Sequence, residues 1–101
     1  LRKQLSSASE IKRHFGTNAK RVSNRLADIE AADNLEILMQ IPAANCHSLS
    51  GHKNGQWAVN ISPNFRLLFE IMNNPIPMIR INEINLRLVT SIRLLKVEDY
   101  H

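Results

Sequence analysis

The sequence predicts an α+β fold in which N-terminal helices pack on one face of a small antiparallel sheet. Two observations support this class. Apolar residues recur at helical spacing up to Pro42, and from residue 56 onward the apolar period changes to two, which is typical of strands. With 101 residues, 44% of them hydrophobic and 22% charged, the chain has ordinary globular composition and is long enough for one domain, residues 1–101.

The first helix is predicted by the stretch Ser7-Ala8-Ser9-Glu10, which matches a capping box. In that motif the Ser and Glu side chains satisfy backbone N–H groups that have no partner at a helix start. Ile11 and Phe15 follow at a spacing of four, and Gly16 is a plausible residue just after the helix end.

A second helix is predicted to begin after Thr17, since three apolar residues then repeat at helical spacing: Val22, Leu26 and Ile29. Asp33-Asn34 either interrupts this helix or starts another turn that continues through residue 39. Pro42 ends the helical region, because proline lacks an N–H and disfavours helical geometry in the residue before it.

The strands are predicted in the second half of the chain, after a loop at residues 43–55. The stretches "QWAVNIS" (56–62) and "FRLLFEI" (65–71) both alternate apolar and polar residues, and Pro63-Asn64 joins them into an antiparallel hairpin. Residues 72–85 show no clear pattern, and a last strand is expected at about 88–97. Trp57 leads an alternating strand, so a role as core anchor is favoured over base stacking.

The charge distribution favours an anionic partner. The formal net charge is +4, with seven bases and one acid in residues 1–25, against four acids and no base in residues 26–50. A basic surface fits nucleic acid, although solvated helix faces are the favoured explanation for the N-terminal bases taken alone. No apolar run approaches the length that spans a bilayer.

The lone cysteine, Cys46, cannot form an internal disulfide, which indicates a reducing, cytoplasmic environment. Its neighbour His47 does not complete any zinc-site spacing, so no metal is expected, and Cys46 is interpreted as a small buried residue.

Arg66 is a candidate phosphate ligand. It alternates with the apolar residues of its strand and therefore projects from the face that is not in the core. A guanidinium is a planar fork that suits a phosphate. The alternative is a surface ion pair with Glu70 on the same face.

The chain ends with side chains that exchange protons: Asp99, Tyr100 and His101. A frayed polar terminus is the ordinary explanation. Alternation on the last strand places Arg93 on one side with Val97 and Asp99, and Lys96 on the other side with Glu98 and Tyr100.

Together, "CHSLSG", "GQWAVNISPNFRLLFE" and the terminal "VTSIRLLKVEDYH" resemble the HigB-type killer proteins of the RelE/ParE toxin superfamily. The resemblance extends over nearly the whole chain. It implies a RelE-like toxin fold, which usually begins with a strand, and that strand is expected before Leu1.

The resemblance also implies a function. Many members are metal-independent endoribonucleases that cut mRNA on the translating ribosome, without a cofactor, and are neutralised by a helix-turn-helix antitoxin from the same operon. The matching catalytic positions are His47, Arg66, Asp99, Tyr100 and His101, and the bases expected to bind RNA are Lys53, Arg66, Arg93 and Lys96. Gly55 matches a family position that shapes the loop.

One position departs from the family pattern. Many relatives carry Lys in the loop where this chain has Ser50, which cannot supply a positive charge. Two alternatives therefore stay open beside the ribonuclease: a ParE-like inhibitor of DNA gyrase, and a degenerate toxin that only binds its antitoxin.

Overall fold

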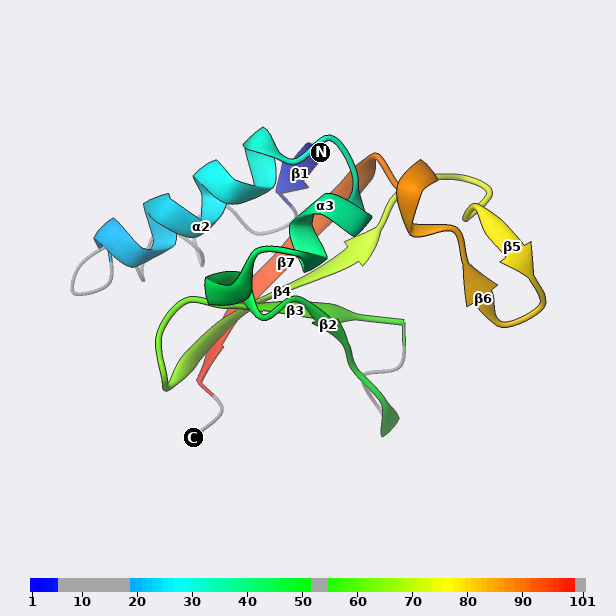
Figure 1. Ribbon diagram of the computed structural model, residues 1–101. Helices are drawn as coiled ribbons and strands as arrows, with labels where there is room; N and C mark the ends of the chain where they lie inside the picture. Colours follow the sequence, from blue (N-terminus) through cyan, green and yellow to red (C-terminus); the bar gives the residue numbers. More distant parts are fainter. Residues whose placement is uncertain (6–18, 52–54, 100–101) are drawn as a thin grey trace.

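The structure, a computed structural model, describes residues 1–5, 19–51 and 55–99 (Figure 1). Its elements follow in this order: β1 (Arg2–Leu5), α2 (Ala19–Ala31), α3 (Leu35–Met39), η2 (Pro42–Ala44), β2 (His47–Ser48), β3 (Trp57–Asn60), β4 (Phe65–Ile71), β5 (Met78–Arg80), β6 (Glu83–Ile84), η4 (Leu86–Leu88) and β7 (Ser91–Asp99). The predicted α+β class is confirmed. The first predicted helix and its capping box lie outside the described residues.

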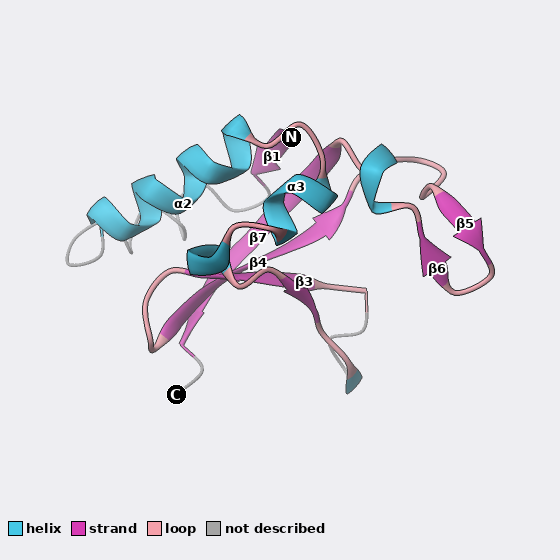
Figure 2. Cartoon of the chain, viewed as in Figure 1, coloured by secondary structure: helices cyan, strands magenta, loops and turns pink. Residues whose placement is uncertain are grey.

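The main sheet has five strands in the order β1-β7-β4-β3-β2, and β5 and β6 form a separate two-stranded sheet. The pairs β7–β4, β4–β3 and β3–β2 are antiparallel, whereas β1 and β7 are parallel. Helices α2 and α3 lie above the main sheet, and the β5–β6 hairpin projects to one side of it (Figures 1 and 2). The last strand in the sequence is therefore an inner strand of the sheet.

The sequence analysis predicted no strand at the start of the chain, yet residues 2–5 form β1. β1 runs parallel to β7, with Arg2 opposite Ser91 and Leu5 opposite Leu94. The backbone N–H of Arg2 also donates to the carbonyl of Thr90 over 2.8 Å. The stretch "RKQL" does not alternate apolar and polar residues, so its pairing with a strand some 90 positions away leaves no local signal in the sequence.

The helical spacing of the second predicted helix is confirmed by α2. Val22 and Ile29 are fully buried, and the half-buried Leu26 packs against the same core. The helix ends at Ala31, and Asn34 caps a new helix, α3, by accepting a hydrogen bond from the N–H of Ile37 over 2.9 Å. The helical region is therefore interrupted before residue 35, and Asn34 also starts a further helix, so both expectations for residues 33–34 are observed.

One hydrophobic core joins the helices to the sheet. It contains apolar residues from α2, α3 and four strands of the main sheet or their flanking loops: Val22, Ile29, Ala32, Leu35, Leu38, Ala44, Cys46, Trp57, Val59, Ile61, Leu67, Phe69, Val89, Ile92, Leu94 and Val97. Trp57 stacks on Phe69 with ring centroids 6.3 Å apart and an interplanar angle of 24°. Trp57 is 7% exposed, so the prediction of a core anchor is confirmed.

The predicted hairpin of residues 56–71 is confirmed. β3 and β4 pair with Trp57 opposite Phe69 and Asn60 opposite Arg66. The connection is closed by a hydrogen bond from the N–H of Ile61 to the carbonyl of Phe65, over 3.0 Å. The two strands therefore present their alternating side chains to the same two faces.

The last strand begins and ends later than predicted, at Ser91 and Asp99. Asn73 explains its start, since its side-chain oxygen accepts from the backbone N–H groups of Thr90 and Ser91 over 3.0 and 3.1 Å. Its amide nitrogen donates to the carbonyl of Leu88 over 3.3 Å. These bonds connect the chain leaving β4 to the chain entering β7.

β7 is not a regular strand, and strict alternation is therefore wrong for it. Its register with β4 shifts between Leu68 and Phe69, which are opposite Lys96 and Leu94. Leu95 is the extra residue of this β-bulge. Before the bulge the core residues are Ile92 and Leu94, and after it the core residue is Val97, which changes the parity of the strand.

Two stretches predicted as loops contain short elements. Residues 43–55 include the end of η2 and the two-residue strand β2, and residues 72–85 include the β5–β6 hairpin. No helix in the described part of the chain has the length and apolar character needed to cross a bilayer.

The cap of α3 gives a first prediction. Replacing Asn34 with Ala removes the oxygen that accepts from the Ile37 N–H, so we expect the free energy of unfolding to fall by about 0.5–2 kcal/mol. Urea denaturation would measure this change. An Asn34→Asp variant keeps an acceptor and is expected to stay near wild type; an equal loss in both variants would contradict the assignment of the cap.

A second prediction concerns Cys46. Burial of its thiol raises the thiol pKa from 9.0 to about 12. Between these values the unfolded chain has lost the thiol proton while the folded chain keeps it, so folding is progressively disfavoured as the pH rises. The limiting slope is about 1.4 kcal/mol per pH unit. Urea denaturation from pH 8 upward should show a steeper loss for wild type than for Cys46→Ala, and parallel curves would contradict the burial effect.

Candidate functional site

The face of the main sheet opposite α2 and α3 carries charged side chains from its two longest strands. Arg66 and Glu70 come from β4, and Arg93, Lys96 and Glu98 come from β7. All five alternate with residues of the hydrophobic core, and we call them the polar face. Three bases against two acids leave this surface with a small positive excess.

Arg66 pairs with Glu98 on the neighbouring strand. The Nε of Arg66 donates to Oε2 of Glu98 over 2.8 Å, and Nη2 lies 2.6 Å from the same oxygen. Both side chains are largely shielded from solvent, with exposed fractions of 16% and 17%. The alternative of an ion pair between Arg66 and Glu70 is therefore wrong in its partner, because the residues in register across the strands are 66 with 98 and 70 with 93.

Glu70 instead lies near Arg93, with Oε1 3.6 Å from Nη1. The two side chains are 38% and 37% exposed, so solvent screens this pair more than the Arg66–Glu98 pair. The bulge at Leu95 explains why Arg93 is on this face at all. Alternation had predicted Arg93 on the opposite side from Lys96, and the extra residue brings both onto the polar face.

The centre of this face is not open. Ala58 on β3 lies opposite Leu68 on β4, and these residues are 0% and 1% exposed although neither belongs to the core beneath the helices. Leu68 lies opposite Lys96 and between the two ion pairs. The charged groups therefore surround a buried apolar centre, where electrostatic interactions are stronger than in bulk water.

His47 lies on β2 opposite Ala58, and the register therefore assigns it to the same side of the sheet as the polar face. Its Nδ1 is 2.7 Å from the carbonyl oxygen of Asn45. A carbonyl only accepts, so Nδ1 carries the proton and Nε2 is the atom that can exchange one with a ligand. Asn45 lies at the end of η2 and has a left-handed backbone conformation, with φ of 43°. Its carbonyl faces the His47 ring in this conformation.

On this side of the sheet, His47 on β2 and Arg66 on β4 are separated by two strand spacings across the sheet and by two residues along the strand. With strands about 4.8 Å apart and about 3.4 Å per residue, their backbones are on the order of 12 Å apart. Side chains of their length can reach toward a common phosphate over that span. The structure thus brings together His47, Arg66, Arg93 and Lys96 on one side of the sheet.

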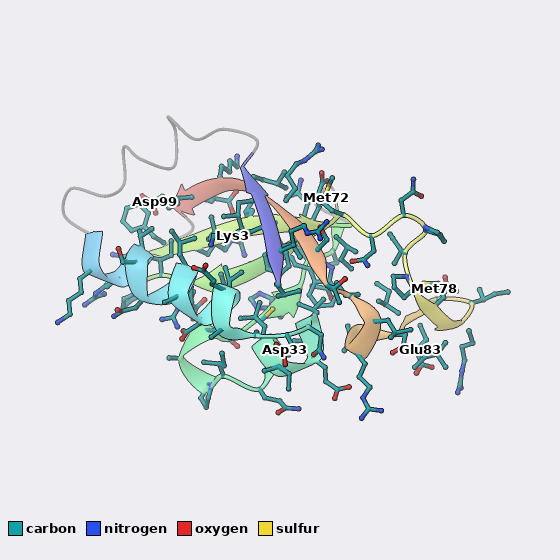
Figure 3. All side chains as sticks on the ribbon, turned by 90° about the horizontal axis from the view of Figure 1, so that it is seen from above. Lys3, Asp33, Met72, Met78, Glu83 and Asp99 are labelled. Atoms are coloured by element: carbon teal, nitrogen blue, oxygen red, sulfur yellow. The ribbon has the colours of Figure 1, made fainter. Side chains whose placement is uncertain are left out.

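The C-terminal residues are described only in part. Asp99 is exposed at the end of β7, opposite Phe65, and Figure 3 shows it at the opposite end of the molecule from the β5–β6 hairpin. Because Phe65 packs against the hydrophobic core, the register assigns Asp99 to the helix side of the sheet and not to the polar face. Tyr100, His101 and the loop base Lys53 lie outside the described residues.

Arg25 on α2 supports the strand beside this site, and the sequence analysis did not identify it. Its Nε donates to the backbone carbonyl of Asn60 over 2.6 Å, and its Nη1 lies 2.6 Å from Asp28, with the Arg25 side chain only 11% exposed. Asn60 is in register with Arg66. Arg25 therefore fixes α2 to the end of β3, beside the polar face, and only the tertiary fold reveals this contact.

Neither a group of metal ligands nor an ionised thiol is found among the described residues. In the described ranges, no three His, Cys, Asp or Glu residues come together as metal ligands. Cys46 is buried, as predicted, and its raised pKa keeps the thiol protonated near neutral pH. The arrangement offers a base or acid at His47 and guanidinium and ammonium groups that attract an anion.

Comparison with solved structures identifies the fold. The chain aligns over 100% of its length with 100% of the YoeB/ParE toxin from Agrobacterium tumefaciens, at 10% identity and a TM-score of 0.56. It aligns over 100% of its length with 97% of the matched chain of the YoeB–YefM complex from Staphylococcus aureus, at 16% identity and a TM-score of 0.55. These matches show a RelE/YoeB-like toxin fold.

A third similar structure is the toxin–antitoxin complex RelBE2 from Mycobacterium tuberculosis. It matches 98% of this chain and 96% of its own at 12% identity, with a TM-score of 0.51. No family model matches the sequence, and no curated protein is significantly similar to it. The shared property is the fold, along the whole length of the chain.

The Arg66–Glu98 pair gives a third prediction. Glu98→Gln removes the carboxylate charge that faces the largely shielded Arg66 guanidinium, and we expect a loss of about 1–3 kcal/mol in the free energy of unfolding. Glu70→Gln is the matched control in the same sheet, where the more exposed pair is expected to contribute less than about 1 kcal/mol. Urea denaturation of both variants measures the difference, and equal losses would contradict the ranking.

Proposed function

We propose that this chain is the HigB-type toxin of a type II toxin–antitoxin system, within the RelE/ParE superfamily. Its reaction would be metal-independent endonucleolytic cleavage of mRNA on the translating ribosome, in the cytoplasm. The observation that carries the proposal is that His47 and Arg66 lie on the same side of a sheet whose fold matches toxins over 98–100% of the chain.

RNA can be cut without a metal or a protein nucleophile, because its own 2′-OH can attack the adjacent phosphorus. The protein must remove a proton from that hydroxyl, supply one to the 5′-oxygen, and stabilise the charge on the phosphate. Groups that titrate near neutral pH do this well, each contributing on the order of 10²–10⁴-fold. His47 and His101 are the proposed pair for proton transfer, and His47 offers Nε2 for the step.

Arg66 is proposed to stabilise the pentavalent phosphate. A substrate phosphate would compete with the Glu98 carboxylate for this guanidinium, so binding would include a rearrangement of the pair. Arg93 and Lys96, on the same face, would contact neighbouring phosphates of the RNA. Lys53, from the loop, is proposed to contact a further phosphate.

Tyr100 and His101 are proposed to complete the site, while Asp99, on the helix side of the sheet, is proposed to act through them. Asp99 lies at the end of β7, where it would orient the residues that follow. Tyr100 would donate to the phosphate or stack on a base, an interaction worth roughly 1–3 kcal/mol per base. The proposed partner is a helix-turn-helix antitoxin, and a solved structure with this fold is described as a toxin–antitoxin complex.

A second candidate is a toxin that binds its antitoxin without cutting RNA. Two observations favour it: Glu98 already occupies two nitrogens of Arg66, and Ser50 stands where many relatives have a loop lysine. A ParE-like gyrase inhibitor is the third alternative. The experiment below separates all three.

The fourth prediction is that the purified chain cleaves a defined mRNA on translating ribosomes and leaves 2′,3′-cyclic phosphate ends. His101→Ala and Arg66→Met should each lower the cleavage rate on the order of 10²–10⁴-fold, because each removes a group acting in the transition state. Mapping of new RNA ends measures both the rate and the product.

Ser23→Ala, on the exposed side of α2, serves as the control and should cleave at the wild-type rate. Thermal unfolding of all variants checks that the fold is intact. Full activity of His101→Ala would refute the proposed mechanism. No cleavage by the folded wild type would support the antitoxin-binding alternative, and DNA damage on expression without mRNA loss would support gyrase inhibition.

A further inference from the structure

Among the described residues, the backbone carbonyl of Asn45 has one hydrogen-bond partner, the imidazole ring of His47. The carbonyl oxygen lies 2.7 Å from Nδ1 of the ring. No backbone N–H in the described part of the chain donates to this oxygen, so the ring is the group that satisfies it. The bond joins residues only two positions apart, and it holds the ring proton of His47 on Nδ1.

Asn45 makes this bond in a backbone conformation that few residue types adopt. Its φ of 43° and ψ of 50° lie in the left-handed region. In the part of the chain that the structure describes, Asn45 and Asn82 are the two non-glycine residues with a positive φ. Most side chains clash with the backbone in this region, whereas glycine adopts it freely and asparagine tolerates it. The residue type at position 45 therefore supports the direction in which its carbonyl points.

The chain on both sides of Asn45 is held in place. Ala44 and Cys46 are buried, and both belong to the hydrophobic core. The N–H of Asn45 donates to the carbonyl of Pro42 over 3.2 Å and closes η2. Because the side chains before and after Asn45 are both packed in the core, its carbonyl cannot turn away from His47 without moving part of that core.

His47 is also held through its own backbone. It lies on β2, which pairs with β3, and its partner in the register is Ala58. The N–H of Leu49, just after β2, donates to the carbonyl of Gln56 over 2.9 Å. The pairing with β3 fixes the backbone of His47 and the Asn45 carbonyl fixes its ring, so both the place and the orientation of the imidazole are determined.

We propose that Asn45 is a positioning residue for His47, and that its left-handed backbone keeps Nε2 of the imidazole unprotonated for use as the general base. This role rests on the proposed ribonuclease function, and it assigns to His47 the removal of the 2′-OH proton. That proton passes to Nε2 while the 2′-oxygen forms a bond to phosphorus. The bond from phosphorus to the 5′-oxygen breaks, and this oxygen takes a proton from a second group, proposed to be His101.

Loss of the Asn45 carbonyl would affect the reaction in two ways. A neutral imidazole carries one proton, which can lie on either nitrogen when no neighbour selects between them. Molecules with the proton on Nε2 cannot accept another one there. The ring would also lose the contact that sets its orientation, and a displacement of about 1 Å in a catalytic group can lower a rate about 10²-fold.

The experiment compares the variants Asn45→Gly and Asn45→Val with the wild type, each as the full chain. Glycine keeps the left-handed conformation, whereas the β-branched valine strongly disfavours it. NMR of nitrogen-labelled protein at about pH 8, where an ordinary imidazole is neutral, shows which ring nitrogen carries the proton. The spectrum of a His47→Gln variant identifies the signals that belong to His47.

The wild type and Asn45→Gly should both carry the proton on Nδ1 of His47 and should cleave mRNA on ribosomes at the same rate. Asn45→Val should show the proton on Nε2 in part of the molecules, and its cleavage should be about 10–100-fold slower. Retention of both properties by the glycine variant would assign them to the backbone conformation and not to the asparagine side chain.

The matched control is Asn82→Val, which places valine at the other left-handed position, with φ of 65°, in the turn between β5 and β6. It should leave the His47 signals and the cleavage rate unchanged. Thermal unfolding checks each variant. If Asn45→Val is unfolded, Asn45→Ala carries the test, since alanine also disfavours the left-handed region but less strongly than a β-branched residue.

A wild type with the His47 proton on Nε2 would overturn the proposal. An Asn45→Val variant that folds and keeps the wild-type tautomer or the wild-type rate would also overturn it. Absence of cleavage by a folded wild type would refute the proposed function, while the NMR comparison of the same variants would still decide whether Asn45 positions the ring.

Discussion

The pairing of β7 with β4 is the constraint on which the rest of the structure depends. Seven residues of β4 are in register with β7, and the opposite edge of β7 binds β1. Through β4 the sheet continues to β3 and β2, so every strand of the main sheet is connected through this pair. The side of these two strands that faces the helices provides Phe69 and Leu94 to the core, while the opposite side provides Arg66 and Glu98.

The bulge at Leu95 shows how a local irregularity determines the chemistry of a surface. With strict alternation, Arg93 and Lys96 would lie on opposite faces, so whichever face of β7 entered the core would carry one of these charges into it. The extra residue allows Leu94 and Val97 to be buried together and places both bases beside Arg66. Bulges of this kind are often found near functional sites, where they redirect side chains.

The parts of the fold that could be predicted from the sequence are those with a local signal. The period of Val22 and Ile29 indicated α2, and the alternation around Trp57 and Phe69 indicated the β3–β4 hairpin. The parallel strand β1 and the bulge had no such signal, because both depend on pairing between distant residues. The face of Arg66 followed from alternation, but its partner required the register of β4 with β7. The likeness to toxins in the sequence agrees with the fold, while the roles of Tyr100 and His101 stay predictions.

The order of the strands in the sheet has a consequence for synthesis of the protein. β1 is made first and β7 is made last of the strands, yet the two are adjacent, with Arg2 opposite Ser91. While the ribosome is still translating the region after β4, both β1 and β4 have an unpaired edge and the sheet is divided. Contacts this distant in sequence make folding slow, since a long loop must close before they form. Nascent chains that stop before β7 therefore cannot complete the main sheet, and cotranslational folding is limited to the helices, the β2–β3–β4 part of the sheet and the β5–β6 hairpin.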